Sequence, residues 1–299
     1  MTDVPFDAVL SVRDLTVSLP KEMERLHAVE GISFDLRRGE ILCIIGESGS
    51  GKSVTASTVM GLLPPVMRPS GGSILFNGTD LLTMPERQRR ALRGKSLSMI
   101  FQDPLSALNP LMTVGAQIDE VLVAHGWTDR AKRDAKVLEL LGEVGLPDPP
   151  LMRLQYPFRL SGGQRQRVMI AIALALDPEV LIADEPTTAL DVTTQAQILE
   201  LIRAIQRRKG MSVMFITHDF GVVADIADRV IVMEKGHLVE QGPAAQVLTA
   251  PTHPYTRRLI AAVPRLRDTD RAADTEAPVV LQGGGRHKHY RSGGRVGGG

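Results

Sequence analysis

A continuous apolar run that ends in a glycine-rich stretch is the feature that most restricts what this chain can fold into. The run ILCIIG covers residues 41–46, and GESGSGKS follows from Gly46 to Ser53. An uninterrupted apolar run of this length is typical of a parallel strand that is buried on both faces. Glycines directly behind such a strand let the backbone curl tightly before a helix begins. The sequence therefore predicts a strand, a tight loop and a helix in succession.

Further strand and helix patterns indicate an α/β fold with a mainly parallel sheet. Three more buried-strand candidates, VLIADEP at 180–186, SVMFIT at 212–217 and RVIVME at 229–234, alternate with helical segments. Such alternation is typical of parallel sheets. The N-terminal part instead predicts short strands and turns, with one Asn-Gly hairpin signal. Residues 113–160 show helical spacing without strand signals, which predicts an inserted helical subdomain.

Composition and charge narrow the class of protein. The 299 residues carry 35 basic and 34 acidic side chains, a net charge of +1, and only 4% aromatic residues. A near-neutral charge and scarce rings argue against nucleic acid as a partner. The single cysteine, Cys43, excludes an internal disulfide and a cysteine-rich metal site. Without a signal-peptide pattern or an apolar run near the ~20 residues of a membrane span, we expect a soluble cytoplasmic protein.

The stretch GESGSGKS fits the P-loop pattern G-x-x-x-x-G-K-[ST], whose backbone N–H groups surround phosphate oxygens. Lys52 is expected to reach the β- and γ-phosphates, and Ser53 to offer its hydroxyl to Mg²⁺. A glycine-rich turn with an accidental Lys-Ser pair is the alternative, and the strand–loop–helix context favours the phosphate site. The other predicted nucleotide-binding positions here are Gly46, Glu47, Ser48, Gly49, Ser50 and Gly51.

Two adjacent acids close the strand pattern VLIADEP. A carboxylate at the end of a buried strand places Asp184 near the metal, through a water molecule. Glu185 follows where an attacking water would lie and is the candidate general base. Both acids also suit a helix cap or a solvent-exposed pair, but the P-loop earlier in the chain favours a nucleotide site. Kinases and GTPases do not need the second acid here, so ATP hydrolysis is the predicted chemistry.

The order of short motifs resembles that of the ATP-binding subunits of ABC transporters. GESGSGKS, FQDP, LSGGQ, LIADEP, ALD and ITHD follow one another within about residues 8–264. The resemblance implies a RecA-like P-loop NTPase with an N-terminal antiparallel β subdomain and a helical insertion at about 103–163. It also implies that two such domains meet head to tail, the LSGGQ of one closing over the ATP of the other. The residues expected at a partner's γ-phosphate are Ser161, Gly162, Gly163 and Gln164.

Three further residues take their expected roles from the same resemblance. Gln102 would contact Mg²⁺ and the attacking water, and its loop would report to the membrane subunits. His218 would touch the γ-phosphate and help to position the water, while Asp191 would line the seam between the two domains. Taken alone, His218 also suits a structural histidine, and Asp191 also suits a cap on the helix that begins near Val192.

An aromatic platform for the adenine, usual in this family near the N-terminal strands, is missing. Between Leu19 and Ser33 the sequence has no Phe, Tyr or Trp, and the only ring is that of His27. His27 or Leu26 is therefore expected as a weaker platform. Phosphate contacts would then supply most of the affinity for the nucleotide.

The C-terminal part indicates a branch of the family. PTHPYTRRLIAAVP at 251–264, within an extension at 248–264, resembles the C-terminal extension of subunits that import oligopeptides, dipeptides and related solutes. An ordinary helix that begins at a proline is the alternative. Residues 265–299 are charged and then glycine-rich, which predicts a disordered tail or linker, in which His287 and His289 form at most a weak metal pair. The chain is also compatible with the first half of a fused double ATP-binding subunit.

Together the motifs predict an ATPase subunit at the cytoplasmic face of the cell membrane that binds ATP and Mg²⁺ and powers import of peptides or related small solutes. The expected partners are a second ATP-binding domain (a copy, a sister subunit or a fused half), two transmembrane permease subunits and, indirectly, an extracytoplasmic solute-binding protein. The alternatives are a soluble ABC protein of translation or DNA repair, an exporter ATPase, and a non-catalytic nucleotide-binding regulator. The HPYT segment argues against the first two, and intact Glu185 and His218 argue against the third.

Overall fold

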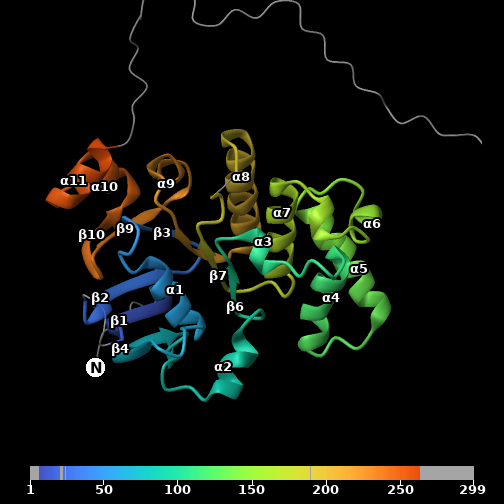
Figure 1. The fold of residues 1–299 in the computed structure, drawn as a ribbon, viewed down its shortest axis with the longest axis horizontal. Coiled ribbons are helices and arrows are strands. Elements are labelled where there is room, and N and C mark those ends of the chain that lie inside the picture. Colours follow the sequence, from blue (N-terminus) through green and yellow to red (C-terminus); the bar gives the residue numbers. More distant parts are fainter. Residues whose placement is uncertain (1–6, 21–22, 24, 189, 263–299) are drawn as a thin grey trace, which may run out of the picture. The chain divides into compact units, whose positions relative to one another are not determined.

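The structure is a computed structural model of the 299-residue chain. It describes residues 7–20, 23, 25–188 and 190–262, and Figure 1 shows the order of their helices and strands. The predicted tail at 265–299, with its two histidines, lies outside the described residues.

The central element is a six-stranded sheet in the order β10-β9-β3-β8-β7-β6. Neighbouring strands from β9 to β6 pair in parallel, and β10 pairs antiparallel with β9 at the edge. The short apolar runs form its inner strands because both of their faces are covered. This confirms the predicted mainly parallel sheet. The strands are β3 (Ile41–Ile45), β6 (Leu97–Ile100), β7 (Val180–Asp184), β8 (Ser212–Ile216), β9 (Arg229–Glu234) and β10 (His237–Pro243).

A second, antiparallel sheet is built by the N-terminal part in the order β2-β1-β4-β5. The Asn-Gly turn between β4 and β5 has positive φ at Asn77 (47°) and Gly78 (79°), as a tight hairpin turn requires. The predicted N-terminal antiparallel β subdomain is therefore confirmed. Its strands are β1 (Ala8–Ser18), β2 (His27–Arg37), β4 (Arg68–Phe76) and β5 (Thr79–Asp80).

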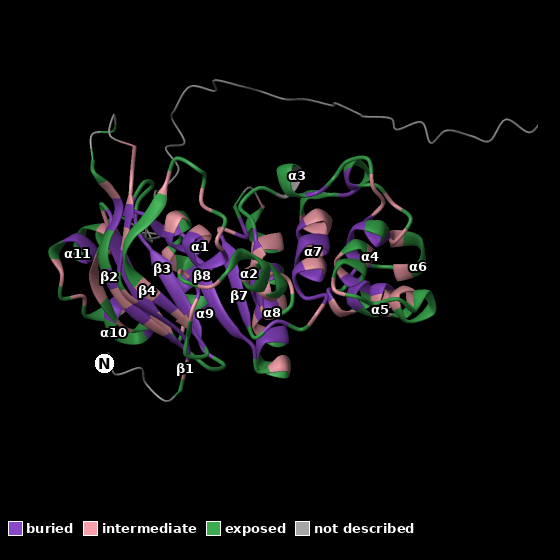
Figure 2. Ribbon diagram, turned by 90° about the horizontal axis from the view of Figure 1, so that it is seen from below, coloured by how far each residue is buried: buried purple, intermediate pink, exposed green. Residues whose placement is uncertain are grey.

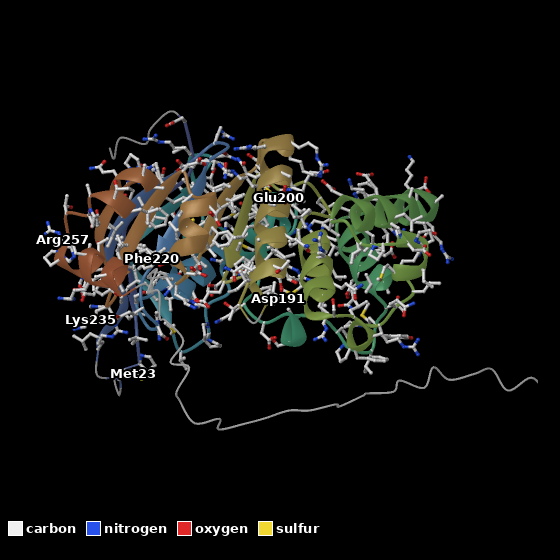
Figure 3. The ribbon with its side chains drawn as sticks, turned by 90° about the horizontal axis from the view of Figure 1, so that it is seen from above. Met23, Asp191, Glu200, Phe220, Lys235 and Arg257 are labelled. Atoms are coloured by element: carbon white, nitrogen blue, oxygen red, sulfur yellow. The ribbon has the colours of Figure 1, made fainter. Side chains whose placement is uncertain are left out.

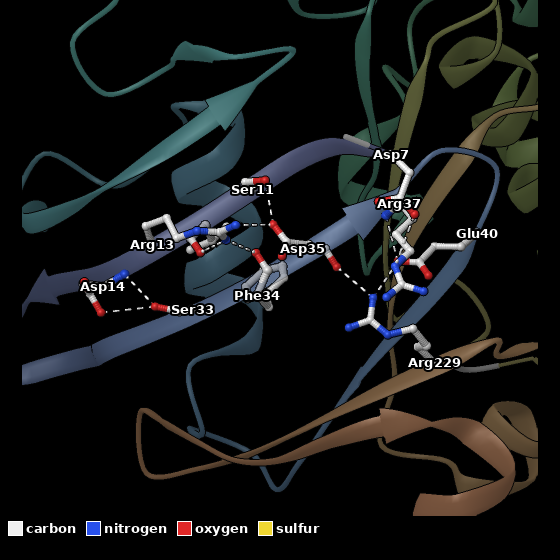
Figure 4. A network of polar contacts seen from close by, with 11 residues as sticks. Asp7, Ser11, Arg13, Asp14, Ser33, Phe34, Asp35, Arg37, Glu40 and Arg229 are labelled. Carbon is white, nitrogen blue, oxygen red and sulfur yellow. Dashed lines mark hydrogen bonds and ion pairs between the residues drawn. The ribbon is translucent and has the colours of Figure 1, made fainter. Parts of the chain in front are cut away.

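A network of polar contacts ties the two sheets together (Figure 4). Arg229 of β9 donates to the backbone carbonyl of Asp35 in β2 at 3.1 Å and to the Glu40 carboxylate at 2.9 Å. The Asp35 carboxylate accepts from Ser11 at 2.6 Å and from Arg13 at 2.7 Å in β1. Burial raises the pKa of Glu40, and its hydrogen-bonded neighbours oppose that shift. Since Glu40 directly precedes β3, the network fixes the start of the strand that leads into the P-loop.

Four helices and one 3₁₀ turn lie between β6 and α7 in the chain (Figure 1). Within this insertion α4 and α5 pack on each other and on α7. Asp129 caps α5 by accepting from two backbone N–H groups, which explains why the helix begins there. The helices are α1 (Lys52–Met60), α2 (Glu86–Leu92), α3 (Pro104–Ala107), α4 (Val114–Ala124), α5 (Arg130–Glu143), α6 (Pro149–Met152), η1 (Pro157–Arg159), α7 (Gly162–Ala173), α8 (Val192–Lys209), α9 (Phe220–Ile226), α10 (Ala244–Thr249) and α11 (Pro254–Ala261).

Two hydrophobic cores lie on the two faces of the parallel sheet, whose inner strands β3, β7 and β8 are buried throughout (Figure 2). The alternation of side chains along β3 shows this directly: Ile41, Cys43 and Ile45 join one core, while Leu42 and Ile44 join the other. Burial raises the pKa of the Cys43 thiol far above its ordinary value. Cys43 is therefore a small core residue.

Candidate active site

The P-loop connects β3 to α1 and takes a backbone path that only glycine follows without strain. Gly46, Gly49 and Gly51 have φ values of 153°, 76° and 102°. A Cβ at Gly46 would lie 2.2 Å from the Met233 carbonyl oxygen, and one at Gly51 would lie 2.8 Å from the Ala28 carbonyl oxygen. The glycines therefore let the loop close against β9 and β2.

Lys52 folds back over the loop that precedes it. Its ammonium donates to the carbonyl oxygens of Gly46 at 2.7 Å and Glu47 at 2.9 Å. Burial lowers the pKa of Lys52, while the nearby carboxylates of Glu185 and Asp184 raise it. The side chain is thus a cation at the base of the loop, beside two acids.

The end of β7 brings Asp184 to the start of α1. The Ser53 hydroxyl donates to the Asp184 carboxylate at 3.0 Å, although 131 residues separate them. Burial raises the pKa of Asp184, and the Ser53 hydrogen bond opposes that shift. The pair offers oxygen ligands of the kind that Mg²⁺ uses together with substrate phosphates. Among the described residues no group of three or more His, Cys, Asp or Glu side chains could hold a metal alone.

Glu185 stands one residue further, at the centre of a polar cluster. Its carboxylate accepts from the Gln102 amide at 3.1 Å and from the Thr188 hydroxyl at 3.0 Å, and lies 3.2 Å from Nδ1 of His218. Its backbone has φ = 46°, in the left-handed region, and its N–H donates to the Ile216 carbonyl. A strained backbone that is held by several contacts is typical of a functional position. The structure thus brings together the three predicted catalytic side chains.

An open pocket of about 170 Å³ lies between this cluster and the P-loop. Gln102 and Glu185 form one wall of the pocket. The loop and the first turn of α1 form the other, through Ser48, Gly49, Ser50, Gly51, Lys52, Ser53 and Val54. Backbone amides, a cation and a helix N-terminus on one wall suit phosphate groups, and a carboxylate opposite them suits activation of water.

The LSGGQ stretch forms the N-terminus of α7. The Ser161 hydroxyl accepts from the Gln164 N–H at 3.2 Å, and the Gln164 side chain accepts from the Ser161 N–H at 3.0 Å. This capping box satisfies both residues within the first helical turn. No hydrogen bond or ion pair given for the described residues joins this stretch to the P-loop.

Gly163 has a structural role that the sequence alone did not reveal. A Cβ there would lie 2.6 Å from Cγ2 of Thr194 in α8, whereas a Cβ at Gly162 would lie 3.5 Å from the Leu190 side chain. Gly163 therefore allows α7 and α8 to pack closely, while Gly162 has room for a methyl group.

Asp191 caps α8, which was one of the two roles considered from sequence. It accepts from the Thr194 N–H at 2.9 Å and from the Thr194 hydroxyl at 2.8 Å. These hydrogen bonds lower the pKa of Asp191. Figure 3 shows Asp191 at the end of α8, with Glu200 further along the same helix. Because the side chain is exposed, the cap and a place at a domain seam are compatible.

Near the P-loop, the hairpin between β1 and β2 supplies no aromatic ring among its described residues. Leu26 is 74% exposed, and His27 lies 3.6 Å from the Glu30 carboxylate. Arg25, which the sequence did not single out, donates to the Gly49 carbonyl at 2.8 Å. Its guanidinium is therefore a cation beside the loop, and only the folded chain places it there.

Comparison with known families identifies the chain. The family described as ABC transporter matches residues 29–188, more than half of the 299 residues. The chain belongs to the ABC transporter family. The family described as the C-terminal region of oligopeptide/dipeptide transporters matches residues 239–285, the last part of which lies beyond the described residues. The resemblance drawn from the sequence motifs is confirmed.

Two curated relatives are about half identical to this ABC domain. The peptidoglycan transport ATP-binding protein YejF of Agrobacterium fabrum is 51% identical over 284 residues, which are 95% of this chain and 52% of that protein. The dipeptide transport ATP-binding protein DppD of Bacillus subtilis is 51% identical over 261 residues, 87% of this chain and 78% of that protein. The chain thus spans about half the length of the first relative and about four fifths of the second.

A solved structure with the same fold is the dimeric ATP-binding cassette MJ0796 in a post-hydrolysis state with ADP and Pi. It has a TM-score of 0.70 and 28% identity, and the match covers 79% of this chain and 98% of the cassette. The predicted P-loop NTPase fold of the ABC type is therefore confirmed. No helix in the described ranges is both long and apolar enough to cross a membrane.

Proposed function

We propose that this chain is an ATPase that powers import of peptides or related small solutes through a membrane complex. The observation that carries the proposal is Glu185, held by Gln102, Thr188 and His218 across an open pocket from the P-loop. That arrangement places a base opposite a phosphate cradle. The ABC family and the neighbour that holds ADP and Pi support ATP hydrolysis.

Binding of ATP uses the loop and the first turn of α1. Backbone N–H groups of the loop and the Lys52 ammonium would neutralise the β- and γ-phosphates. Ser53, Asp184 and Gln102 carry oxygen ligands that would hold Mg²⁺, which offsets phosphate charge when bound. Asp184 already accepts from Ser53 at 3.0 Å, so these two groups lie close enough to share one ion.

Hydrolysis then requires that one water be aligned and deprotonated. Glu185 takes the water proton as the water oxygen bonds to the γ-phosphorus. The bond between that phosphorus and the bridging oxygen breaks, which leaves ADP and inorganic phosphate. Gln102 and His218 lie within hydrogen-bond distance of Glu185 and keep its carboxylate aimed at the pocket.

The site is completed by a second ATP-binding domain. Ser161, Gly162 and Gly163 present a helix N-terminus that has no phosphate of its own, which suits the γ-phosphate held by a partner. A second copy of this chain carries both halves and is the simplest partner. ABC ATPases dimerise and work with permease subunits, and we place this chain with two such subunits at the cytoplasmic face of the membrane, with a solute-binding protein acting on the other side.

The proposed class of solute is supported by the C-terminal region and by the relatives. Residues 239–285 match the region described for oligopeptide/dipeptide transporters, and the DppD relative is named for dipeptide transport. The decisive test is uptake of labelled dipeptides and longer peptides by cells whose own copy of this chain is deleted. Restoring the wild-type chain should restore peptide uptake, and Glu185→Gln should not. Peptide uptake that is unchanged by the deletion, or that Glu185→Gln restores fully, would overturn the proposal.

A further inference from the structure

The segment around α11 reaches the P-loop through one side chain. Tyr255 is 3% exposed, and its hydroxyl oxygen accepts a hydrogen bond from the backbone N–H of Glu47 at 3.1 Å. The two residues are 208 positions apart in the sequence. The segment that matches the oligopeptide/dipeptide transporter region therefore contacts the nucleotide site directly.

The start of α11 is fixed before Tyr255 makes this contact. The Nδ1 atom of His253 accepts from the Tyr255 N–H at 3.2 Å and so caps the helix, and Pro254 occupies its first turn. Glu240 of β10 accepts from the Thr252 N–H at 2.7 Å and from its hydroxyl at 2.8 Å. The helix is thereby anchored to the edge of the parallel sheet, with Arg257 exposed on its outer side (Figure 3).

The surroundings of Tyr255 suit a fixed, neutral acceptor. The Arg258 guanidinium lies 5.8 Å from the centre of the Tyr255 ring, and its Nη2 is 3.5 Å from Oε1 of Glu234. A tyrosine hydroxyl is protonated at neutral pH, and burial raises the pKa of Tyr255 further. Next to Glu234 the carbonyl of Met233 packs against Gly46. The end of β9 and Tyr255 therefore both contact the start of the loop.

Lys52 also holds the start of the loop, through the carbonyl oxygens of Gly46 and Glu47. When ATP binds, Lys52 must share its three N–H donors with phosphate oxygens. The Glu47 N–H is donated to Tyr255, and Glu47 does not line the pocket between Glu185 and the P-loop, so phosphate bound in that pocket leaves this hydrogen bond in place. We infer that Tyr255 is a positioning residue, which keeps the start of the P-loop in its phosphate-binding conformation and lets the C-terminal segment set the affinity for ATP.

The test compares Tyr255→Phe with Thr252→Ala in the full chain, by titration with Mg²⁺-ATP. Tyr255→Phe keeps the buried ring and removes only the hydroxyl. Thr252→Ala removes a hydroxyl hydrogen bond from the same segment, away from the P-loop. Each variant loses one hydrogen bond, but only the one lost in Tyr255→Phe reaches the P-loop. We therefore expect the Kd for ATP to rise about 3- to 10-fold in Tyr255→Phe and to change less than about twofold in Thr252→Ala. Hydrogen exchange at the Glu47 amide should accelerate only in Tyr255→Phe.

The inference rests on ATP binding, which is one part of the proposed function, and does not depend on peptide import. An unchanged Kd in Tyr255→Phe, or an equal rise in Thr252→Ala, would overturn the inference alone. A wild-type chain that binds no ATP would overturn it together with the proposed function. Melting temperatures of both variants show whether any loss of affinity merely follows a loss of stability.

Discussion

Two glycine-rich regions of this chain differ in what surrounds them. The P-loop finds partners across the chain, since Ser53 donates to Asp184 at the end of another strand, the Glu47 N–H donates to Tyr255, and the Gly49 carbonyl accepts from Arg25. The hydrogen bonds given for Ser161 and Gln164, at the start of α7, lie within one helical turn, and Gln164 caps its own helix. The first region thus lines a pocket together with Gln102 and Glu185. The second is a capped helix N-terminus, and no hydrogen bond or ion pair among the described residues joins it to the first region.

The largest effect is expected at Glu185, which lines the same pocket as the P-loop. Glu185→Gln keeps the size and the hydrogen-bonding capacity of the side chain but removes the base, so kcat should fall about 100- to 10,000-fold. ATP binding should persist, because the loop contacts of Lys52 are unchanged. Steady-state hydrolysis and ATP titration measure the two quantities. A variant that hydrolyses ATP at near the wild-type rate would refute the assignment of the base.

The LSGGQ stretch at the start of α7 is tested by a pair of neighbouring substitutions. Gly162→Ala has room for its methyl group and lies in a helix, so the melting temperature should not fall. Hydrolysis should nevertheless drop about 10- to 100-fold, because the methyl group would displace the partner's phosphate. Gly163→Ala meets Thr194 at 2.6 Å and should lower both quantities. If Gly162→Ala hydrolyses ATP normally, the α7 N-terminus does not contact a nucleotide.

A smaller effect is expected from Thr188, whose hydroxyl donates to Glu185 at 3.0 Å. Thr188→Val keeps the shape of the side chain and removes the donor, so kcat should fall about 3- to 10-fold with little change in KM. Rescue by Thr188→Ser would show that the hydroxyl is responsible. Equal activity in Thr188→Val and wild type would show that Gln102 and His218 are sufficient to orient the base.

The smallest effect concerns the cap of α8. Asp191 has a lowered pKa because it accepts from Thr194, so its carboxylate stabilises the fold above its ordinary pKa of 3.8 and loses that effect as pH falls through the lower folded value. Asp191→Ala should lower the melting temperature at neutral pH, and the difference from wild type should shrink below about pH 4. Asp191→Asn, a good cap without charge, is the control. A difference that persists unchanged at low pH would contradict this account.

The sequence predicted the parts of the site that follow directly from a strand. Gly46 to Ser53 come after β3, and Asp184 and Glu185 close β7, so the carboxyl ends of parallel strands brought them together. Gln102 and His218 depended on the family resemblance, since an isolated Gln or His carries little signal. Both nevertheless lie beside Glu185.

Other contacts were not predictable, because they join segments that are distant in sequence. The Tyr255 hydroxyl meets Glu47 only after α11 has folded against the end of β9, and Arg25 reaches Gly49 only through the hairpin. Gly163 belongs to the LSGGQ motif, but its close contact with Thr194 depends on how tightly α7 and α8 pack against each other. The motif identified the glycine, and tertiary packing supplied a second reason for it.

If the P-loop of one chain and the LSGGQ stretch of another form each catalytic site, two variants with different defects should complement each other. The measurement mixes two variants of impaired hydrolysis, Lys52→Ala and Gly162→Ala, and follows ATP hydrolysis. In an equal mixture half of the dimers pair the two variants, and one of their two sites is intact, so we expect about a quarter of the wild-type rate. A mixture no faster than the mean of the two variants alone would contradict the claim.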